Sequence, residues 1–173
     1  GAWLHSPQGG VTLFPAWYAA PKPDWPAPLA QAGFPLYDGD MAQGLSADVQ
    51  QFLADGPAPL VFSAGSAMQQ GREFLRQAVA ASLALGRRAI LMTRTPEQLP
   101  PSLPASVLHT PYEPFGALLP HACALVHHGG MGSSAQALRA GLPQLVLPHA
   151  YDQFDNAMRL ERLGVAATLD PAR

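Results

Sequence analysis

The sequence predicts an α/β domain with a doubly wound parallel sheet, a Rossmann-like fold. From about residue 46, short apolar runs alternate with segments of helical periodicity. The runs are apolar throughout, which is typical of strands that are covered by helices on both faces. Small-residue loops follow several of these runs, where open α/β sheets bind their ligands.

Length, charge and cysteine content narrow the class of protein. The 173 residues suffice for one well-buried core. A formal charge of -2 without a basic run argues against nucleic acid as a partner. The single cysteine cannot form an internal disulfide, which favours a reducing, cytoplasmic location. We expect no transmembrane segment, because no apolar stretch approaches the roughly 18 to 20 residues that span a bilayer.

Residues 1–40 differ in composition from the rest of the chain. They contain all three tryptophans and seven of the prolines, so we expect an irregular or extended linker and entry segment with at most a short strand at 11–14. Residues 41–173 are then the ligand-binding domain. Only 13% of the residues are charged, against about 25% usually. Either a neighbouring domain covers part of the surface or the composition is biased.

Six apolar segments are the predicted strands. The third, ASVLHT, is a weaker candidate, and the sixth, VAATL, is short. Their ranges are 59–63, 88–93, 105–110, 123–128, 144–148 and 165–169.

Four helices are predicted between and around these strands. Ser46 is placed to cap a helix over 47–55, and Gly56-Pro57 ends it. The second, over 72–85, has Leu75, Val79 and Leu83 at spacing four. The third runs from about Ser133 and stops at Gly141. The fourth covers 152–163, with an apolar face formed by Phe154, Ala157, Leu160 and Leu163.

Three loops lie at the predicted carboxyl edge of the sheet, over residues 63–71, 127–134 and 148–153. The middle loop reads HHGGMGSS. Its glycines allow close approach of a ligand, and the helix that follows presents free amides at Ser133 and Ser134 with a partial positive charge. His128 can add an imidazole proton, so the loop is a predicted anion site. A P-loop is excluded because its lysine is missing.

The third loop places Asp152 and Gln153 at a helix N-terminus beside the anion site. A carboxylate next to a carboxamide suits the paired hydroxyls of a sugar. Asp152 can also be read simply as a helix cap. A second alternative is a dinucleotide site, because Gly130, Gly132 and Ala135 fit G-x-G-x-x-A and Asp152 follows about 20 residues on. A purely structural glycine-rich turn is a third.

The segments VHHGGMGSSAQALRAGLP and PHAYDQFDN together resemble the donor-binding region of GT-B glycosyltransferases in the UDP-glycosyltransferase superfamily, bacterial branch. The resemblance covers about residues 33–169 in the order of elements and is specific between Pro111 and Gly164. More loosely, the sequence is similar to bacterial enzymes that glycosylate lipids or natural products, including the rhamnosyltransferase of rhamnolipid synthesis. The implied fold is one half of GT-B.

The resemblance implies binding roles for residues in each loop. In the first loop Ser66 would face phosphate. Diphosphate would be bound as well by His128, Gly130, Gly132 and Ser133. Asp152 and Gln153 would hold the sugar hydroxyls.

The nucleoside end departs from the family pattern. Tyr112 stands where an aromatic residue packs against the base, and Gln136 stands where a glutamate usually holds the ribose. The loss of a charge-assisted hydrogen bond at Gln136 is worth on the order of 1 kcal/mol. Phe115 replaces a common glutamine, so we expect the base to be read more by shape.

The implied function is that of the donor domain of an inverting glycosyltransferase. It would transfer a hexose from a UDP-glucose or dTDP-rhamnose type donor to an acceptor hydroxyl of a lipid or small molecule. The general base is expected in a missing N-terminal acceptor domain, so no catalytic residue is assigned in this chain and the chain alone is expected to be inactive. A lipid acceptor would add membrane association.

No cofactor and no metal are expected. His109, His121, His127 and His149 crowd the same half of the chain, but their spacing fits no zinc pattern. Two other functions stay open: an NAD(P)- or flavin-binding domain of an oxidoreductase, and a non-catalytic nucleotide-sugar-binding module.

Overall fold

The computed structural model describes residues 6–37, 44–65 and 71–169. The chain divides into two compact units, Gly1–Tyr37 and Asp38–Arg173.

The first unit is a small parallel strand pair with an aromatic cluster. Strand β1 (Gly10–Thr12) pairs with β2 (Leu29–Gln31). The expectation of at most one short strand was therefore wrong, because it overlooked β2. Between the strands, the rings of Phe14, Tyr18 and Trp25 meet at tilted or edge-on angles, and Trp17 and Phe34 extend the cluster. Aromatic contact, more than an apolar strand pattern, stabilises this unit.

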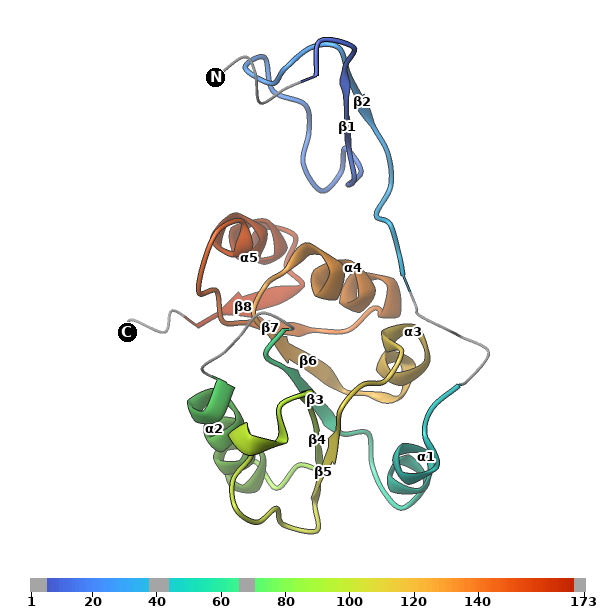
Figure 1. Ribbon diagram of the computed structural model, residues 1–173, viewed down its shortest axis with the longest axis vertical. Coiled ribbons are helices and arrows are strands. Elements are labelled where there is room, and N and C mark those ends of the chain that lie inside the picture. The colour runs from blue at the N-terminus through green and yellow to red at the C-terminus, as the bar shows by residue number, and fades with distance from the viewer. Residues whose placement is uncertain (1–5, 38–43, 66–70, 170–173) are drawn as a thin grey trace. The chain divides into compact units, whose positions relative to one another are not determined.

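The second unit is a six-stranded parallel sheet flanked by helices, as predicted (Figure 1). The strand order is β5-β4-β3-β6-β7-β8. From β3 the chain adds β4 and β5 on one side and then returns to add β6, β7 and β8 on the other side, so the order reverses between β3 and β6. Each predicted apolar segment forms one strand, trimmed at its ends. The bounds are β3 Leu60–Ser63, β4 Ala89–Met92, β5 Val107–Thr110, β6 Ala124–His127, β7 Gln144–Val146 and β8 Ala166–Thr168.

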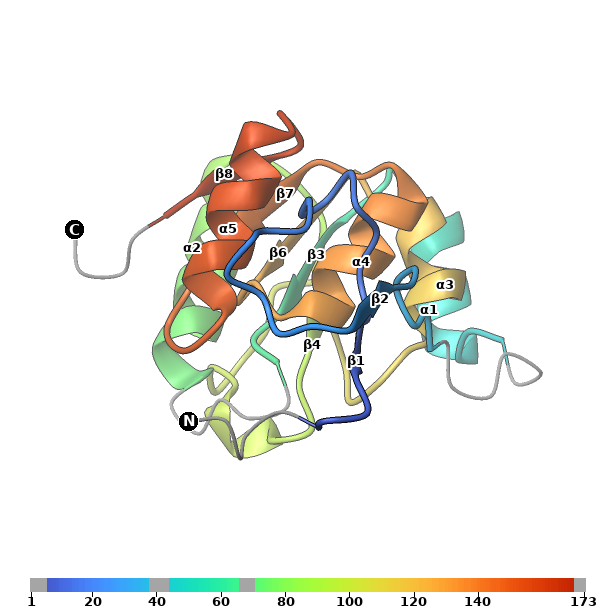
Figure 2. The same cartoon turned by 90° about the horizontal axis from the view of Figure 1, so that it is seen from above.

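Helices cover both faces of this sheet. Helix α2 lies on one side of it, and α1 and α3 lie on the other, as both views show (Figures 1 and 2). Helix α5 contacts β8 and α4. The bounds are α1 Ala47–Ala54, α2 Gly71–Ala84, η3 Pro96–Gln98, α3 Phe115–Leu118, η4 Leu119–His121, α4 Met131–Ala140 and α5 Gln153–Arg162.

Two buried clusters explain why the strands are apolar throughout. Val61 and Ile90 belong to the cluster beneath α1, α3 and α4, while the neighbouring Phe62 and Leu91 belong to the cluster beneath α2. Successive strand residues point to opposite faces, so both faces of β3 and β4 are buried. This burial stabilises the central strands, whose carboxyl ends then present the loops.

Three local expectations were wrong. Leu83 is 53% exposed near the end of α2, and Phe154 is 51% exposed at the start of α5, so neither lies on a buried face. Helix α5 instead buries Asn156, Ala157 and Leu160. Ser46 does precede α1, but its hydroxyl caps no amide of that helix and donates to the carboxylate of Glu113.

The longest of the helices described is α2, with 14 residues. Within the described ranges, none of the helices combines the length and the apolar character that crossing a membrane requires.

Candidate functional site

The candidate site lies where the strand order reverses, at the carboxyl ends of β3 and β6. Ser63 and His127 are paired neighbours at these ends. The chain continues into Ala64-Gly65 on one strand and into His128, Gly129 and Gly130 on the other. In doubly wound sheets the crevice outside this point is the usual ligand site.

The ring of His128 packs directly against two glycines. A Cβ atom added to Gly65 or to Gly130 would overlap the imidazole. Gly65 also has a positive φ of 85°, which glycine adopts at little cost. The two loops therefore hold His128 between them, and a larger residue at either position would displace the ring.

Burial lowers the pKa of His128, and the nearby His149 lowers it further. The Asp152 carboxylate and the backbone of Ser63 act in the opposite direction. The Nδ1 atom of His128 is buried, and in the described part of the chain it has no hydrogen-bond partner of good geometry. Burial thus favours the neutral form of the ring.

Helix α4 begins earlier than the sequence indicated. Gly130 is its N-cap and Met131 its first residue, two positions before the expected start at Ser133. Both the amide and the hydroxyl of Ser134 donate to the Gly130 carbonyl, at 3.0 Å each, so Ser134 is not a free donor. Within the described ranges the amides of Met131, Gly132 and Ser133 have no backbone acceptor.

These three amides form the positive end of the α4 dipole, beside His128. The Cβ position of Gly132 is open, with no atom within 4 Å. A ligand can therefore approach this turn of backbone closely. The arrangement suits an anion such as a diphosphate.

Asp152 and Gln153 stand at the N-terminus of α5, as expected. Asp152 is exposed and accepts a hydrogen bond from Asn156 Nδ2 at 2.9 Å. The Gln153 carboxamide oxygen accepts from the backbone amides of His149 and Ala150, at 2.8 and 3.1 Å. Gln153 thus orders the loop before α5 and keeps only its amide nitrogen for a ligand.

The nucleoside candidates lie on the β5–α3 loop and on α4. Tyr112 is 44% exposed, and the guanidinium of Arg94 lies 5.3 Å from the centre of its ring. Gln136 is buried and lies one helical turn after Gly132 on α4. Ser66, the remaining diphosphate candidate, lies outside the described residues.

Glu113 was not recognised from the sequence, although it fixes the loop that carries Tyr112. Its buried carboxylate accepts hydrogen bonds from the amide and hydroxyl of Ser46 and from the hydroxyl of Thr110. Ser46 is 67 positions away, so no local motif announces the contact. Glu113 therefore ties the candidate nucleoside loop to the start of α1.

Three further residues, to which the sequence analysis gave no role in the site, surround Gly129. The amide of Gly129 donates to His127 Nδ1, and its carbonyl accepts from Asn156 Nδ2. His127 Nε2 in turn contacts the Gln144 carboxamide oxygen at 3.0 Å. The structure thus brings His127, Asn156 and Gln144 into direct support of the loop.

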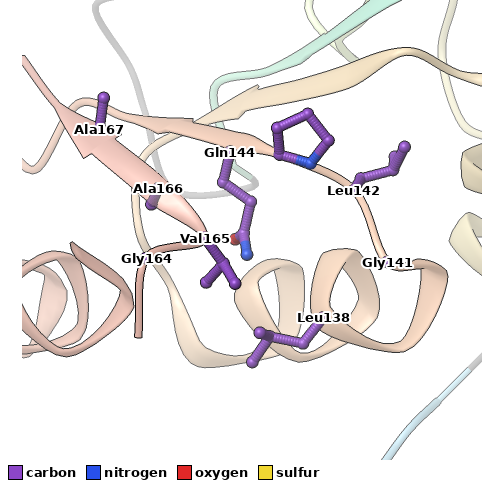
Figure 3. A pocket seen from close by; sticks show the side chains of 9 residues that line it. Leu138, Gly141, Leu142, Gln144, Gly164, Val165, Ala166 and Ala167 are labelled. Carbon is purple, nitrogen blue, oxygen red and sulfur yellow. The ribbon is translucent and has the colours of Figure 1, made fainter. Parts of the chain in front are cut away.

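A surface hollow lies elsewhere, at the amino-terminal ends of β7 and β8 (Figure 3). Leu138, Leu142 and Val165 are among its lining residues, and Gln144 points from β7 towards α4 beside it. None of the predicted site residues lines it. This hollow is therefore separate from the candidate site.

Among the described residues, no group of three or more histidine, cysteine, aspartate or glutamate side chains is arranged to hold a metal ion.

Comparison with known proteins identifies the family. Residues 85–172 match the family described as erythromycin biosynthesis protein CIII-like, C-terminal domain. The chain is 37% identical over 150 residues to O-mycaminosyltylonolide 6-deoxyallosyltransferase of Streptomyces fradiae, which covers 85% of this chain and 34% of that protein. It is 34% identical over 126 residues to vancomycin aglycone glucosyltransferase of Amycolatopsis orientalis, covering 73% of this chain and 31% of that protein.

The fold has solved counterparts as well. The structure of spinosyn rhamnosyltransferase superposes with a TM-score of 0.73 at 27% identity and covers 92% of this chain and 42% of that one. The chain spans about a third of the length of the two curated relatives described above. It therefore belongs to the family of erythromycin biosynthesis protein CIII-like C-terminal domains, homologous to the UDP-glycosyltransferases, with the Rossmann-like fold of the C-terminal half of GT-B glycosyltransferases.

Proposed function

We propose that this chain is the donor-binding domain of an inverting glycosyltransferase that transfers a hexose from a nucleotide-sugar to an acceptor hydroxyl. One observation supports this proposal above the others. His128 packs between Gly65 of the first loop and Gly130 at the start of α4, within electrostatic range of Asp152, and its buried Nδ1 has no hydrogen-bond partner of good geometry among the described residues. A diphosphate and its attached sugar fit that arrangement.

The diphosphate would lie over the N-terminus of α4. The amides of Gly132 and Ser133 would donate to its oxygens. The open Cβ position of Gly132 allows the close approach, and Gly130 leaves room for the ring of His128, which would donate from its imidazole. Ser66 stays in this proposal as the hydroxyl of the first loop. These donors are fixed before the ligand arrives, so little reorganisation is needed.

The sugar would lie towards α5. The Asp152 carboxylate can accept hydrogen bonds from two neighbouring hydroxyls, and the Gln153 amide nitrogen can donate to a third oxygen. Asn156 already orients Asp152. We propose Asp152 as the main sugar contact, because the Gln153 oxygen is engaged by the loop backbone.

The nucleoside would lie against Tyr112, with Gln136 near the ribose. Arg94 occupies one side of the Tyr112 ring, so the base would pack on the rest of its exposed surface. Neither Tyr112 nor Gln136 distinguishes uracil from thymine by a hydrogen bond in this proposal. The shape of this end of the site would decide between the two bases.

The chemistry follows from where charge develops. As the bond from the anomeric carbon to the diphosphate breaks, negative charge accumulates on the leaving nucleotide, next to the α4 amides and His128. Stabilising that charge lowers the barrier. An acceptor hydroxyl would attack from the opposite face, activated by a base in an N-terminal domain. We propose that no metal is required, because these groups supply the positive potential.

The relatives suggest the range of donors to test. Their names specify 6-deoxyallosyl, glucosyl and rhamnosyl transfer, to a tylonolide derivative, a vancomycin aglycone and a spinosyn product respectively. We therefore propose UDP-glucose or a dTDP-6-deoxyhexose such as dTDP-rhamnose as donor, and a lipid or small molecule as acceptor. The lone cysteine is compatible with a cytoplasmic reaction, at the membrane if the acceptor is a lipid.

A thermal-shift panel on this chain tests the proposal. UDP, dTDP, UDP-glucose, dTDP-rhamnose and NAD would each be added with EDTA and again with Mg²⁺. At a hundredfold excess over its Kd, a bound nucleotide raises Tm by roughly 5 to 10 °C. His128→Ala should remove most of the shift, while His121→Ala, an exposed histidine of η4, should keep it. A response to NAD alone would refute the proposal.

A further inference from the structure

Gly129 is held at both of its backbone polar groups. Its N–H donates to His127 Nδ1 at 3.1 Å, and its carbonyl accepts from Asn156 Nδ2 at 2.9 Å. The side chains that make these contacts are 0% and 2% exposed. Buried hydrogen bonds of this kind are costly to break, so the position of Gly129 is closely defined.

The first contact requires one tautomer of His127. Because an N–H of Gly129 points at Nδ1, that atom must be the acceptor and the proton must be on Nε2. Nε2 then donates to the Gln144 carboxamide oxygen, 3.0 Å away. His127 and Gln144 lie on the same sheet face, under α4, because His127 pairs with Val146 and Leu125 pairs with Gln144. Gln144 therefore selects the tautomer that Gly129 needs.

The second contact reaches the sugar side of the site. The Asn156 Nδ2 atom has two protons, and it contacts both the Gly129 carbonyl and Asp152 Oδ2 at 2.9 Å. One amide group thus joins the loop of His128 to the carboxylate at the start of α5. An aspartate or an aliphatic residue at position 156 could not make both bonds.

Gly129 is tightly packed against its neighbours. A Cβ atom on Gly129 would lie 2.8 Å from Val146 Cγ1 and 3.1 Å from the Gln153 carbonyl oxygen. With a φ of 89°, Gly129 also has a conformation that other residues rarely adopt. The loop therefore rests directly on β7 and on the first turn of α5.

We propose that His127, Gln144 and Asn156 are positioning residues that act through Gly129 to hold the diphosphate loop and the Asp152 carboxylate in one fixed geometry. These residues, with Gly129, are called the Gly129 network below. This inference rests on the proposed function of the site. The network couples the two halves of the donor site: loss of Asn156 releases the loop and the carboxylate together.

Calorimetric titration of UDP and UDP-glucose, or of dTDP and dTDP-rhamnose if those bind, tests the coupling. Asn156→Ala should weaken binding of the nucleotide roughly tenfold and remove in addition the extra affinity that the sugar provides. In an Asp152→Ala background, Asn156→Ala should cost no further sugar affinity, because the group that it orients is gone. Asn156→Asp should behave like Asn156→Ala, since it also lacks the donor.

Asp155→Ala is the matched control. Asp155 is the neighbouring residue on α5; it is exposed and pairs with Arg159. Its replacement should leave both affinities within about twofold, as expected for a weak surface ion pair. If Asn156→Ala lowers Tm but leaves the sugar increment intact, Asn156 has only a structural role and the inference is wrong.

Nuclear magnetic resonance tests the network without any ligand. Long-range ¹H–¹⁵N spectra should show His127 protonated at Nε2 only, and the Gly129 amide should be protected from exchange. Gln144→Leu should reduce this protection at least tenfold relative to core amides of β4. A His127 ring protonated at Nδ1 would overturn the inference. If the unaltered chain binds none of the nucleotides, the proposed function fails, and the tautomer and exchange data alone decide on the Gly129 network.

Discussion

The imidazole of His128 occupies the space that a side chain at position 130 would need. Gly130 has a φ of -63° and a ψ of 143°, which any residue can adopt, so its backbone does not require glycine. The requirement comes from the ring alone, because an added Cβ would overlap Nε2. The close contact of these two residues holds the imidazole against the N-cap of α4.

Gly130→Ala is therefore expected to displace the ring without unfolding the domain. The binding of UDP or pyrophosphate should weaken about tenfold, as for the loss of one charge-assisted hydrogen bond. Calorimetric titration gives the affinity, and a urea titration shows whether stability is kept. In a His128→Ala background the same substitution should have little further effect. Equal losses in both backgrounds would mean that Gly130 acts independently of His128.

Gly132→Ala should change stability and binding in opposite directions. The Cβ position is open, and alanine favours helix over glycine by roughly 0.5–1 kcal/mol, so Tm should rise by about 1 to 4 °C. If a diphosphate lies against this turn, the added methyl group obstructs it and the affinity for UDP falls. Thermal unfolding and titration of one preparation measure both. A higher Tm with unchanged affinity would show that the ligand lies elsewhere.

The sequence predicted the strands of the large sheet better than the exact start of the helix at the candidate site. Continuous apolar runs predicted all six strands of the large sheet, because burial on both faces leaves a clear local pattern. The glycine-rich sequence after the fourth run also indicated His128 and its loop as a candidate anion site. It did not locate the start of α4, where Gly130 caps the helix with no side chain of its own.

Local sequence patterns could not predict contacts between distant segments of the chain. Asn156 was overlooked because counting apolar residues placed Phe154 on the buried face of α5, whereas the hydrogen bond to Gly129 requires Asn156 to lie there. Glu113 was overlooked because its partner Ser46 looks like an ordinary helix cap. In both cases a buried polar contact determines the orientation more strongly than the apolar pattern does.

Stability should depend on pH through His127. Burial lowers its pKa to about 4 from 6.5. Between these values the unfolded chain binds a proton that the folded chain excludes, so the free energy of unfolding decreases as the pH falls from about 6.5 to 4. The full loss is roughly 3 kcal/mol. Urea titrations at several pH values measure it.

His128→Ala is the control for this pH dependence. Burial shifts the pKa of His128 in the same direction, so its removal should reduce the slope partly and leave the contribution of His127. An unfolding free energy that stays constant from pH 6.5 to 4.5 in the unaltered chain would show that His127 is not held neutral.

Nucleotide binding should be accompanied by proton uptake at His128. In the free chain burial lowers the pKa of the ring, whereas an adjacent diphosphate favours the imidazolium and raises its pKa. Between the two pKa values each binding event takes up part of a proton, so the affinity should increase as the pH falls through the pKa of the bound state. Calorimetry of UDP binding at pH 6.5, in buffers of different ionisation enthalpy, measures the uptake.

The terminal phosphate of UDP, with a pKa of about 6, contributes to the proton uptake as well, and the His128→Gln variant isolates that contribution. Equal uptake in both proteins would mean that His128 does not contact the diphosphate.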